Sequence, residues 1–225
     1  MAEVHKTTMS PTKIELLAAW LPSQSWYVDS GHEPSLRRAG GFRLDDPAGE
    51  VGIEFLVVVD DSGDTEVPYL VPMTYRGAAE PESEEGLIGL SEHGVLGTRW
   101  LYDGAQDQVL VAELLNLVQG IAQAQAQSAS DTADPTVLVS QWTQPEPLVT
   151  EGSVVVHAPG SATQLVIDAG TPDGNRRSVT LEIVRRLETT DDIGSEKTLG
   201  SVTAGWRAAD GTELRGTFAR VRAIV

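Results

Sequence analysis

The sequence predicts an α+β fold in which a curved antiparallel β-sheet packs against about two α-helices. Two segments, residues 14–21 and 110–121, place apolar side chains at helical spacing. Short runs rich in Val, Ile, Leu and Thr, separated by turns that contain Gly and Asp, fill much of the remaining chain and dominate after residue 135. The chain has 225 residues, 40% of them hydrophobic, so it is long enough to bury a core.

The first helix is expected to begin at Ser10-Pro11, because a hydroxyl side chain caps a helix and proline fits its first turn. Leu17 and Leu21 then recur at helical spacing, and Pro22 is expected to end the helix. A helix with one apolar stripe needs a partner surface, so it is expected to lie across a sheet.

Three strand-like runs follow, at residues 41–44, 51–59 and 67–75. The sequence DDSGD between the last two is typical of a hairpin turn, which predicts an antiparallel pair. Residues 78–85 form an acidic loop by composition, and residues 97–102 are expected to form another short strand.

Asp107 is expected to cap the clearest helix in the chain. The apolar face of this helix comprises Leu110, Leu114, Leu117, Val118 and Ile121. Beyond about Ala124 small and polar residues alternate without apolar periodicity, which predicts the end of the helix and a linker to residue 135.

The second half of the chain is predicted to be rich in strands. Its strand-like runs are residues 136–143, 153–157, 163–168, 178–187, 199–207 and 213–225. Residues 1–127 and 128–225 are therefore treated as two regions. A separate second β-domain and a single continuous body both fit this pattern, and the short linker favours the continuous body.

The charge pattern excludes some partners. The formal net charge is −17, which opposes binding to nucleic acid or to an anionic membrane. Residues 1–150 contain 7 Lys and Arg against 23 Asp and Glu, whereas residues 151–225 contain 9 against 10. This lopsided charge suits a solvated acidic surface, and alternatively a face that docks a basic partner.

Several features predict a soluble cytoplasmic protein. Cysteine is absent, so disulfides and thiolate chemistry are excluded. The first residues lack the apolar segment of a signal peptide, and the longest aliphatic run, residues 55–59, is too short to cross a bilayer.

The search for catalytic groups yields no catalytic residue, cofactor site or metal site. A phosphotransferase needs a phosphate-binding loop with lysine, magnesium carboxylates and a base, and this set cannot be assembled from a chain with three lysines and no His-x-Asp loop. The four histidines are scattered along the chain, which argues against a metal centre. Gly89–His93 begins like the nucleophile elbow of a serine hydrolase, but its last position is His93 instead of glycine.

Three sequence blocks carry a family resemblance. They are LLAAWLPSQSWY at Leu16–Tyr27, YLVPMTYRG at Tyr69–Gly77 and EEGLIGLSEHGVLGTRWLYDGAQDQ at Glu84–Gln108. In order and spacing they resemble the N-terminal cap domain of bacterial maltokinases, and even more that of the related glucosamine-kinase-like sugar phosphotransferases. The resemblance covers roughly the first 125 residues.

In those kinases the cap precedes the catalytic domain. The resemblance therefore implies a stand-alone, non-catalytic accessory protein that docks on a sugar kinase, or on a related enzyme of trehalose, glycogen or amino-sugar metabolism. The partner's identity and the oligomeric state stay open.

Two further hypotheses concern the Glu84–Gln108 block. Its glycines and aromatic residues could form a pocket for a small ligand such as a sugar, since a pyranose ring stacks on an indole. The candidate ligand-binding residues are Glu92, His93, Trp100, Tyr102 and Asp103. The aromatic residues also suit a purely structural role in the core. The third hypothesis is an unrecognised hydrolase that uses Ser91 or a pair of carboxylates in a cleft.

Overall fold

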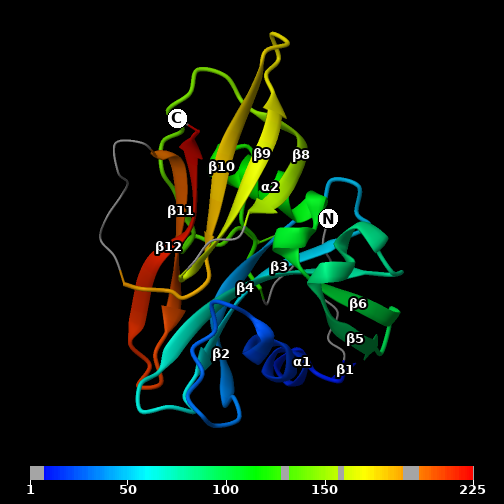
Figure 1. Ribbon diagram of the computed structural model, residues 1–225, viewed down its shortest axis with the longest axis vertical. Helices are drawn as coiled ribbons and strands as arrows, with labels where there is room; N and C mark the ends of the chain where they lie inside the picture. The colour runs from blue at the N-terminus through cyan, green and yellow to red at the C-terminus, as the bar shows by residue number, and fades with distance from the viewer. Residues whose placement is uncertain (1–7, 128–131, 157–159, 190–197, 225) are drawn as a thin grey trace.

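The computed structural model describes residues 8–127, 132–156, 160–189 and 198–224 (Figure 1). Within these residues a single twelve-stranded antiparallel sheet accounts for most of the regular structure, so the α+β prediction holds in a sheet-dominated form. Its path runs β1-β5-β6-β4-β3-β2-β11-β12-β10-β9-β8, with β7 paired to β11 off this path.

The elements have the following bounds. The first half contains β1 (Met9–Ser10), α1 (Lys13–Trp20), β2 (Leu36–Leu44), β3 (Gly52–Asp60), β4 (Val67–Arg76), β5 (Leu87–His93) and β6 (Gly97–Asp103). The second half contains α2 (Gln108–Val118), β7 (Leu138–Val139), β8 (Val149–Val156), β9 (Ala162–Gly170), β10 (Arg176–Val184), β11 (Thr198–Arg207) and β12 (Glu213–Ala223). Short 3-10 turns occupy Leu21–Ser23, Pro81–Gly86 and Gly104–Gln106.

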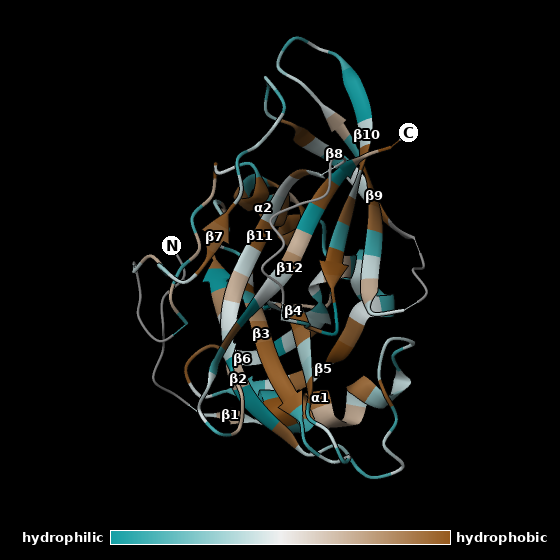
Figure 2. Cartoon of the chain, turned by 90° about the vertical axis from the view of Figure 1, so that its left-hand side faces the viewer, coloured by the Kyte–Doolittle hydropathy of each residue, from teal (hydrophilic) through white to brown (hydrophobic). Residues whose placement is uncertain are grey.

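Strands β3 and β4 form the predicted hairpin and the centre of the molecule. Their register runs from Gly52 opposite Tyr75 to Asp60 opposite Val67, which confirms the antiparallel pair. Every residue of β3 after Gly52 is buried, and the strand is largely brown in the hydropathy view (Figure 2). Because successive side chains of a strand point to opposite faces, β3 supplies two separate cores.

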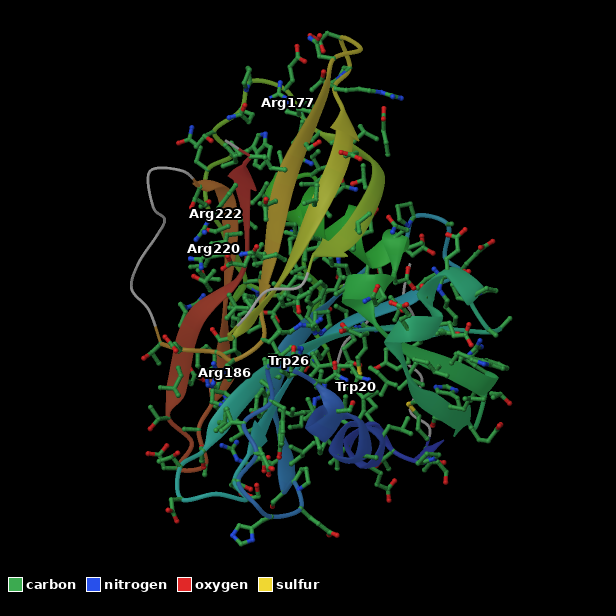
Figure 3. All side chains as sticks on the ribbon, viewed as in Figure 1. Trp20, Trp26, Arg177, Arg186, Arg220 and Arg222 are labelled. Atoms are coloured by element: carbon green, nitrogen blue, oxygen red, sulfur yellow. The ribbon has the colours of Figure 1, made fainter. Side chains whose placement is uncertain are left out.

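The first core lies under α1. Leu17 and Leu21 are completely buried and pack with Leu56 and Val58 of β3. Figure 3 shows Trp20 and Trp26 next to this helix. Their rings meet edge to face with centroids 5.8 Å apart, an arrangement that aromatic pairs favour.

The predicted start of α1 was two residues early. The N-cap is Thr12, whose hydroxyl accepts a hydrogen bond from the backbone N–H of Glu15 at 3.3 Å. The Glu15 carboxylate accepts one in return from the Thr12 N–H at 2.7 Å, which completes a capping box. Ser10 instead belongs to β1, where it pairs with Glu92. The helix ends at Trp20, and Pro22 lies in the 3-10 turn that follows.

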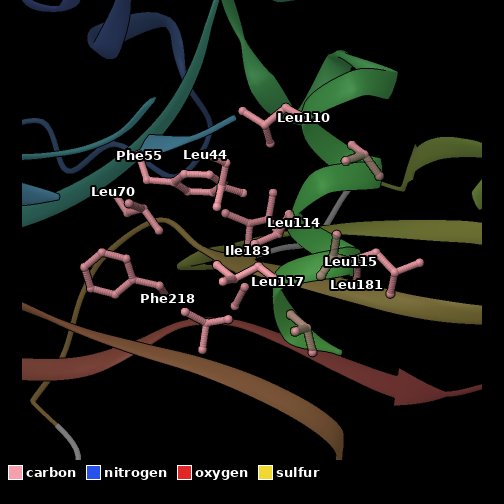
Figure 4. Close-up of a cluster of buried hydrophobic side chains, with 14 of the residues drawn as sticks. Leu44, Phe55, Leu70, Leu110, Leu114, Leu115, Leu117, Leu181, Ile183 and Phe218 are labelled. Atoms are coloured by element: carbon pink, nitrogen blue, oxygen red, sulfur yellow. The ribbon is translucent and has the colours of Figure 1, made fainter. Parts of the chain in front are cut away.

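The second core surrounds α2, which Asp107 caps as predicted. Leu110 and Leu114 are completely buried, and Figure 4 shows them among side chains from several strands, including Phe55 and Ile183. The sheet curves around this helix, so α2 contacts both the central strands and the strands of the second half.

Helix α2 is shorter than predicted. It ends at Val118, and Gly120 then adopts a left-handed backbone with φ of +75°, which terminates helices efficiently. Ile121, assigned to the apolar face from the sequence, therefore lies beyond the helix and is 59% exposed. In the predicted linker, Gln125 forms β-bridges with Arg43 and Ala133.

The strand-rich second half is confirmed, with changed bounds. The predicted strand at 136–143 is reduced to the two residues of β7, and β8 begins at Val149, earlier than expected. The last predicted residues of two strands, 157 and 225, lie outside the described residues. Strands of both regions share one sheet, joined where Trp206 of β11 pairs with Gly40 of β2. No helix in the described ranges is long and apolar enough to cross a membrane.

Replacing Leu114 by Ala should destabilise the fold by about 2–5 kcal/mol, because it removes a completely buried side chain from the α2 core. Urea unfolding followed by circular dichroism measures this change. The matched control is Ile121→Ala, whose exposed side chain should cost less than about 0.5 kcal/mol. Equal losses for the two variants would contradict the assigned core.

Asp107 should make stability depend on acid pH. Its carboxylate accepts hydrogen bonds from Thr74 and twice from Arg76, each at 2.8 Å. Burial alone raises the pKa of Asp107, but these donors outweigh it and hold the pKa below its ordinary value.

A pKa that is lower in the folded state contributes stability above the unfolded value, about 3.9, and loses it as pH falls through the folded value. The stability gap between wild type and Asp107→Asn should therefore be largest near neutral pH and shrink below about pH 4. Urea titrations across this range measure the gap, and a constant gap would be inconsistent with the assignment.

Candidate functional site

The Glu84–Gln108 block folds as the β5–β6 hairpin at one end of the sheet, flanked by two 3-10 turns (Figure 1). The strands pair from Leu87 opposite Tyr102 to His93 opposite Gly97. Strand β5 was not predicted, because its sequence LIGLSEH mixes glycine and polar residues and lacks a clear alternation. Strand β6 was predicted and extends one residue further, to Asp103.

Glu92 and His93 lie at the turn of this hairpin. Glu92 is exposed, and its carboxylate accepts a hydrogen bond from the Thr98 hydroxyl at 2.7 Å. His93 is half-buried, and its Nδ1 accepts hydrogen bonds from the backbone N–H groups of Leu96 at 3.1 Å and Val95 at 3.4 Å. Both side chains thus bond to their own turn, as turn residues commonly do.

Tyr102 and Asp103 lie at the opposite end of β6. Since Glu92 stands opposite Thr98 and a strand rises 3.3 Å per residue, Tyr102 is roughly 13 Å along the strand from Glu92. Tyr102 is buried, and its hydroxyl accepts a hydrogen bond from the Glu80 N–H at 2.8 Å. Trp100 lies between the two ends and is half-buried. The structure therefore distributes the five candidate residues along the hairpin.

Asp103 bonds to a residue that the sequence did not single out. Its carboxylate accepts two hydrogen bonds from Nη2 of Arg185, at 2.6 and 2.8 Å. The Arg185 side chain is completely buried, donates from Nε to the Thr163 hydroxyl at 2.8 Å, and lies 5.1 Å from the centroid of the Trp26 ring. This ion pair ties β6 to the segment after β10. An arginine pair, Arg185-Arg186, at the end of a strand gives no local sign of such a partner.

A second polar cluster holds the start of α1 against the sheet. The buried Glu54 carboxylate contacts Nζ of Lys13 and the hydroxyl of Tyr75, both at 2.5 Å. Burial alone raises the pKa of Glu54, but the Lys13 ammonium and the Tyr75 hydroxyl lower it below its ordinary value. Burial, followed by the Glu54 charge, raises the pKa of Tyr75 well above its ordinary value. These contacts join the start of α1 to strands β3 and β4.

Ser91, the residue of the hydrolase hypothesis, is buried within β5. Its hydroxyl donates a hydrogen bond to the carbonyl oxygen of Pro11 at 2.7 Å, which joins β5 to the start of α1. A nucleophilic serine needs an accessible hydroxyl beside a general base, and Ser91 lacks that access. Within the described ranges no group of three or more His, Cys, Asp or Glu residues is arranged to hold a metal ion.

The hairpin instead presents aliphatic side chains to solvent. Val95 is 63% exposed, and Leu90 and Leu96 are each 44% exposed. We call these three residues the hairpin surface. Exposed aliphatic residues that gather on one element often mark a protein–protein contact. The most conspicuous exposed feature of the block is therefore apolar and suits an interface.

These observations define a class of protein module: an antiparallel sheet crossed by a short helix and ending in a hairpin, whose buried carboxylates Glu54, Asp103 and Asp107 are bonded internally. Residues 20–107 match the family model of the maltokinase N-terminal cap domain. The chain is therefore similar to a maltokinase N-terminal cap domain over this segment, which confirms the resemblance seen in the sequence. The match begins at the last residue of α1 and ends at the cap of α2. A comparison with curated proteins gave no match.

The Asp103–Arg185 pair should be structural. Asp103→Asn and Arg185→Met should each cost about 3–5 kcal/mol, because each leaves a buried charge without its partner. The double variant should lose less than the sum of the two single losses. Urea unfolding of the four proteins gives this double-mutant cycle. Additive losses would show that the two side chains do not act as a pair.

Proposed function

We propose that this protein is a non-catalytic, cap-like accessory that docks through the hairpin surface on a sugar kinase of the maltokinase type. The single observation that carries the proposal is the cap-domain match over residues 20–107, which includes the whole β5–β6 hairpin. A cap domain is a part of a sugar kinase that does no chemistry itself, so a protein containing one is expected to act on or with such a kinase. A related enzyme of trehalose, glycogen or amino-sugar metabolism is the wider class of partner.

The arrangement of the hairpin supports docking over ligand binding. Of the five residues first considered for a ligand, Tyr102 and Asp103 are buried and bonded internally, and Glu92 and His93 bond to their own turn. Sugar binding by stacking needs an open aromatic face, whereas the aromatic candidates are half-buried (Trp100) or buried (Tyr102) and the exposed apolar side chains of the hairpin are aliphatic. Burying exposed aliphatic area against a partner is favourable at about 25 cal/mol per Å².

The acidic charge supports a partner with a basic docking face. The formal net charge of the chain is −17, and the excess of Asp and Glu falls in residues 1–150, which contain the cap segment. Complementary charges speed association and select partners more than they add affinity. A cytoplasmic location follows from this proposal, since the partner enzymes act on intracellular sugars.

Leu96→Lys in the hairpin surface should weaken binding to a purified maltokinase-type kinase from the same organism by at least tenfold, which is about 1.4 kcal/mol. Biolayer interferometry with immobilised kinase measures the dissociation constant. Ile121→Lys is the matched control, because it places the same charge at an exposed aliphatic position outside the hairpin, after the end of α2. Binding should also weaken as salt is raised. Failure of the wild-type protein to bind any such kinase, or equal effects of the two variants, would refute hairpin docking.

A further inference from the structure

The two halves of the chain share one topology. In each half a helix precedes five antiparallel strands: α1 precedes β2 to β6, and α2 precedes β8 to β12, with the short β7 in between. If the five strands of each half are numbered 1 to 5 along the chain, the sheet path β5-β6-β4-β3-β2 followed by β11-β12-β10-β9-β8 has the order 4-5-3-2-1 twice. Figure 1 shows the two sets of strands side by side in the same sheet.

Irregularities of the strands match between the halves as well. The pair of strands 1 and 2 contains a bulge at Ala39 before Gly40 in the first half, and at Glu151 before Gly152 in the second. The pair of strands 4 and 5 contains a bulge at the second residue of strand 4, followed by glycine, in both halves: Ile88-Gly89 and Leu199-Gly200. Bulges are specific features that persist within a fold, so two matched bulge positions indicate a duplicated unit. One additional bulge, at Phe218 of β12, has no counterpart.

The helices fit the same relation. Helix α1 contacts strands 1 and 4 of its half, β2 and β5. Helix α2 contacts strands 1 and 4 of its own half, β8 and β11, and in addition strand 5, β12. The two helices pack on opposite faces of β3. The two units are related by a half-turn about an axis that lies in the sheet, perpendicular to the strands. This rotation keeps the order of the strands, reverses their direction and exchanges the two faces of the sheet. The second unit therefore follows the first head to tail in one sheet.

The junction between the units joins strand 1 of the first unit to strand 4 of the second. It forms where Gly40 of β2 pairs with Trp206 of β11. A Cβ on Gly40 would lie 3.0 Å from the carbonyl oxygen of Gly205 and 3.2 Å from the Cα of Trp206, so glycine permits this close approach. The matched glycine of the second unit is Gly152, and nothing lies within 4 Å of its Cβ position. Its backbone φ is not positive either, so the isolated chain gives no reason for glycine there.

We propose that β8 of one molecule pairs with strand β5 of a second copy, a contact between a strand 1 and a strand 4 like the one that β2 and β11 make within one molecule. β8 is the outermost strand at one end of the sheet, and β5 lies near the other end, where β1 pairs with Glu92 and His93. The neighbouring residues Thr8 and Pro11 bond to Gly94 and Ser91, so the backbone pairing leaves the Leu87–Leu90 part of β5 for a second copy. β5 is strand 4 of the first unit, as β11 is of the second. The strand proposed to pair with β8 is thus strand 4 of a unit, as is β11, the strand that pairs with β2.

The exposed side chains and composition of the two strands suit this pairing. On β8, Val149 and Val154 are 62% and 68% exposed, and the strand contains neither lysine nor proline. The Gln108 side chain donates a hydrogen bond to the Ser153 carbonyl oxygen at 3.1 Å, and pairing with β5 would replace this contact by a backbone hydrogen bond. On β5, Leu87 and Leu90 are exposed next to the part of the edge that β1 leaves free. Because each copy carries a formal charge of −17, repulsion opposes the contact and added salt should favour it.

Multi-angle light scattering after gel filtration, at protein concentrations up to about 1 mM, tests the proposal. The wild-type mass should rise with concentration beyond that of one chain, and more steeply at high salt. Gly152→Val should stay monomeric with an unchanged melting temperature, because the isolated chain has open space at that position. Leu90→Lys should also stay monomeric, and Val154→Lys is a second β8 variant should Gly152→Val fail to fold. The matched control Ile121→Lys should associate like wild type.

A mixture of two variants decides the geometry. Gly152→Val retains an intact β5, and Leu90→Lys retains an intact β8, so an equimolar mixture should form a complex of two chains although each variant alone is monomeric. Three results would overturn the proposal: a wild type that stays monomeric, a mixture that stays monomeric, or a Leu90→Lys variant that self-associates while Gly152→Val does not. The last result would indicate that β8 pairs with β8. Leu90 also belongs to the hairpin surface, but the purified protein is measured without kinase, so none of these outcomes depends on kinase docking.

Discussion

The fold depends on a strand pair, β3 and β4, that is buried on both faces. Val57 and Val58 are adjacent in β3 and completely buried, yet they belong to different cores. One face supports α1 and the hairpin end of the sheet, and the other supports α2 and the strands of the second half. Burial of a valine on each face contributes about 1.5–3 kcal/mol per side chain, so this pair holds both layers in place.

Polar groups between the layers have a complementary role. Asp103 with Arg185, Asp107 with Arg76, and Glu54 with Lys13 each join elements that are distant in sequence. A buried charge that lacks its partner is costly, so each pair also disfavours other arrangements of the elements it joins. Asp103, one of the candidate ligand-binding residues of the hairpin block, belongs to this internal network. That leaves aliphatic side chains as the exposed feature of the hairpin.

Local patterns predicted the elements well where turn chemistry and periodicity agree, as in the β3–β4 hairpin and at the Asp107 cap. They failed where backbone geometry or tertiary pairing decides, as at Gly120, which ends α2, and in β5, whose partners stabilise an unremarkable sequence. The candidate residues Glu92 and Asp103 are close in sequence, but an extended strand separates them, and the partner of Asp103 is 82 residues away. Such a contact leaves no local signature. The duplication is equally hidden, because it lies in strand order and bulges, whereas the two halves differ in charge.

The double-sided burial of β3 has a consequence for how the molecule loses its structure. A core that fills one face of a strand cannot melt while the strand stays in place for the core on the other face, since the exposed apolar face would then meet water. The two cores are therefore coupled through β3, which contributes side chains to both. Although the chain contains two similar units, it should unfold as one cooperative unit. Partial opening should begin at the ends of the sheet, farthest from β3.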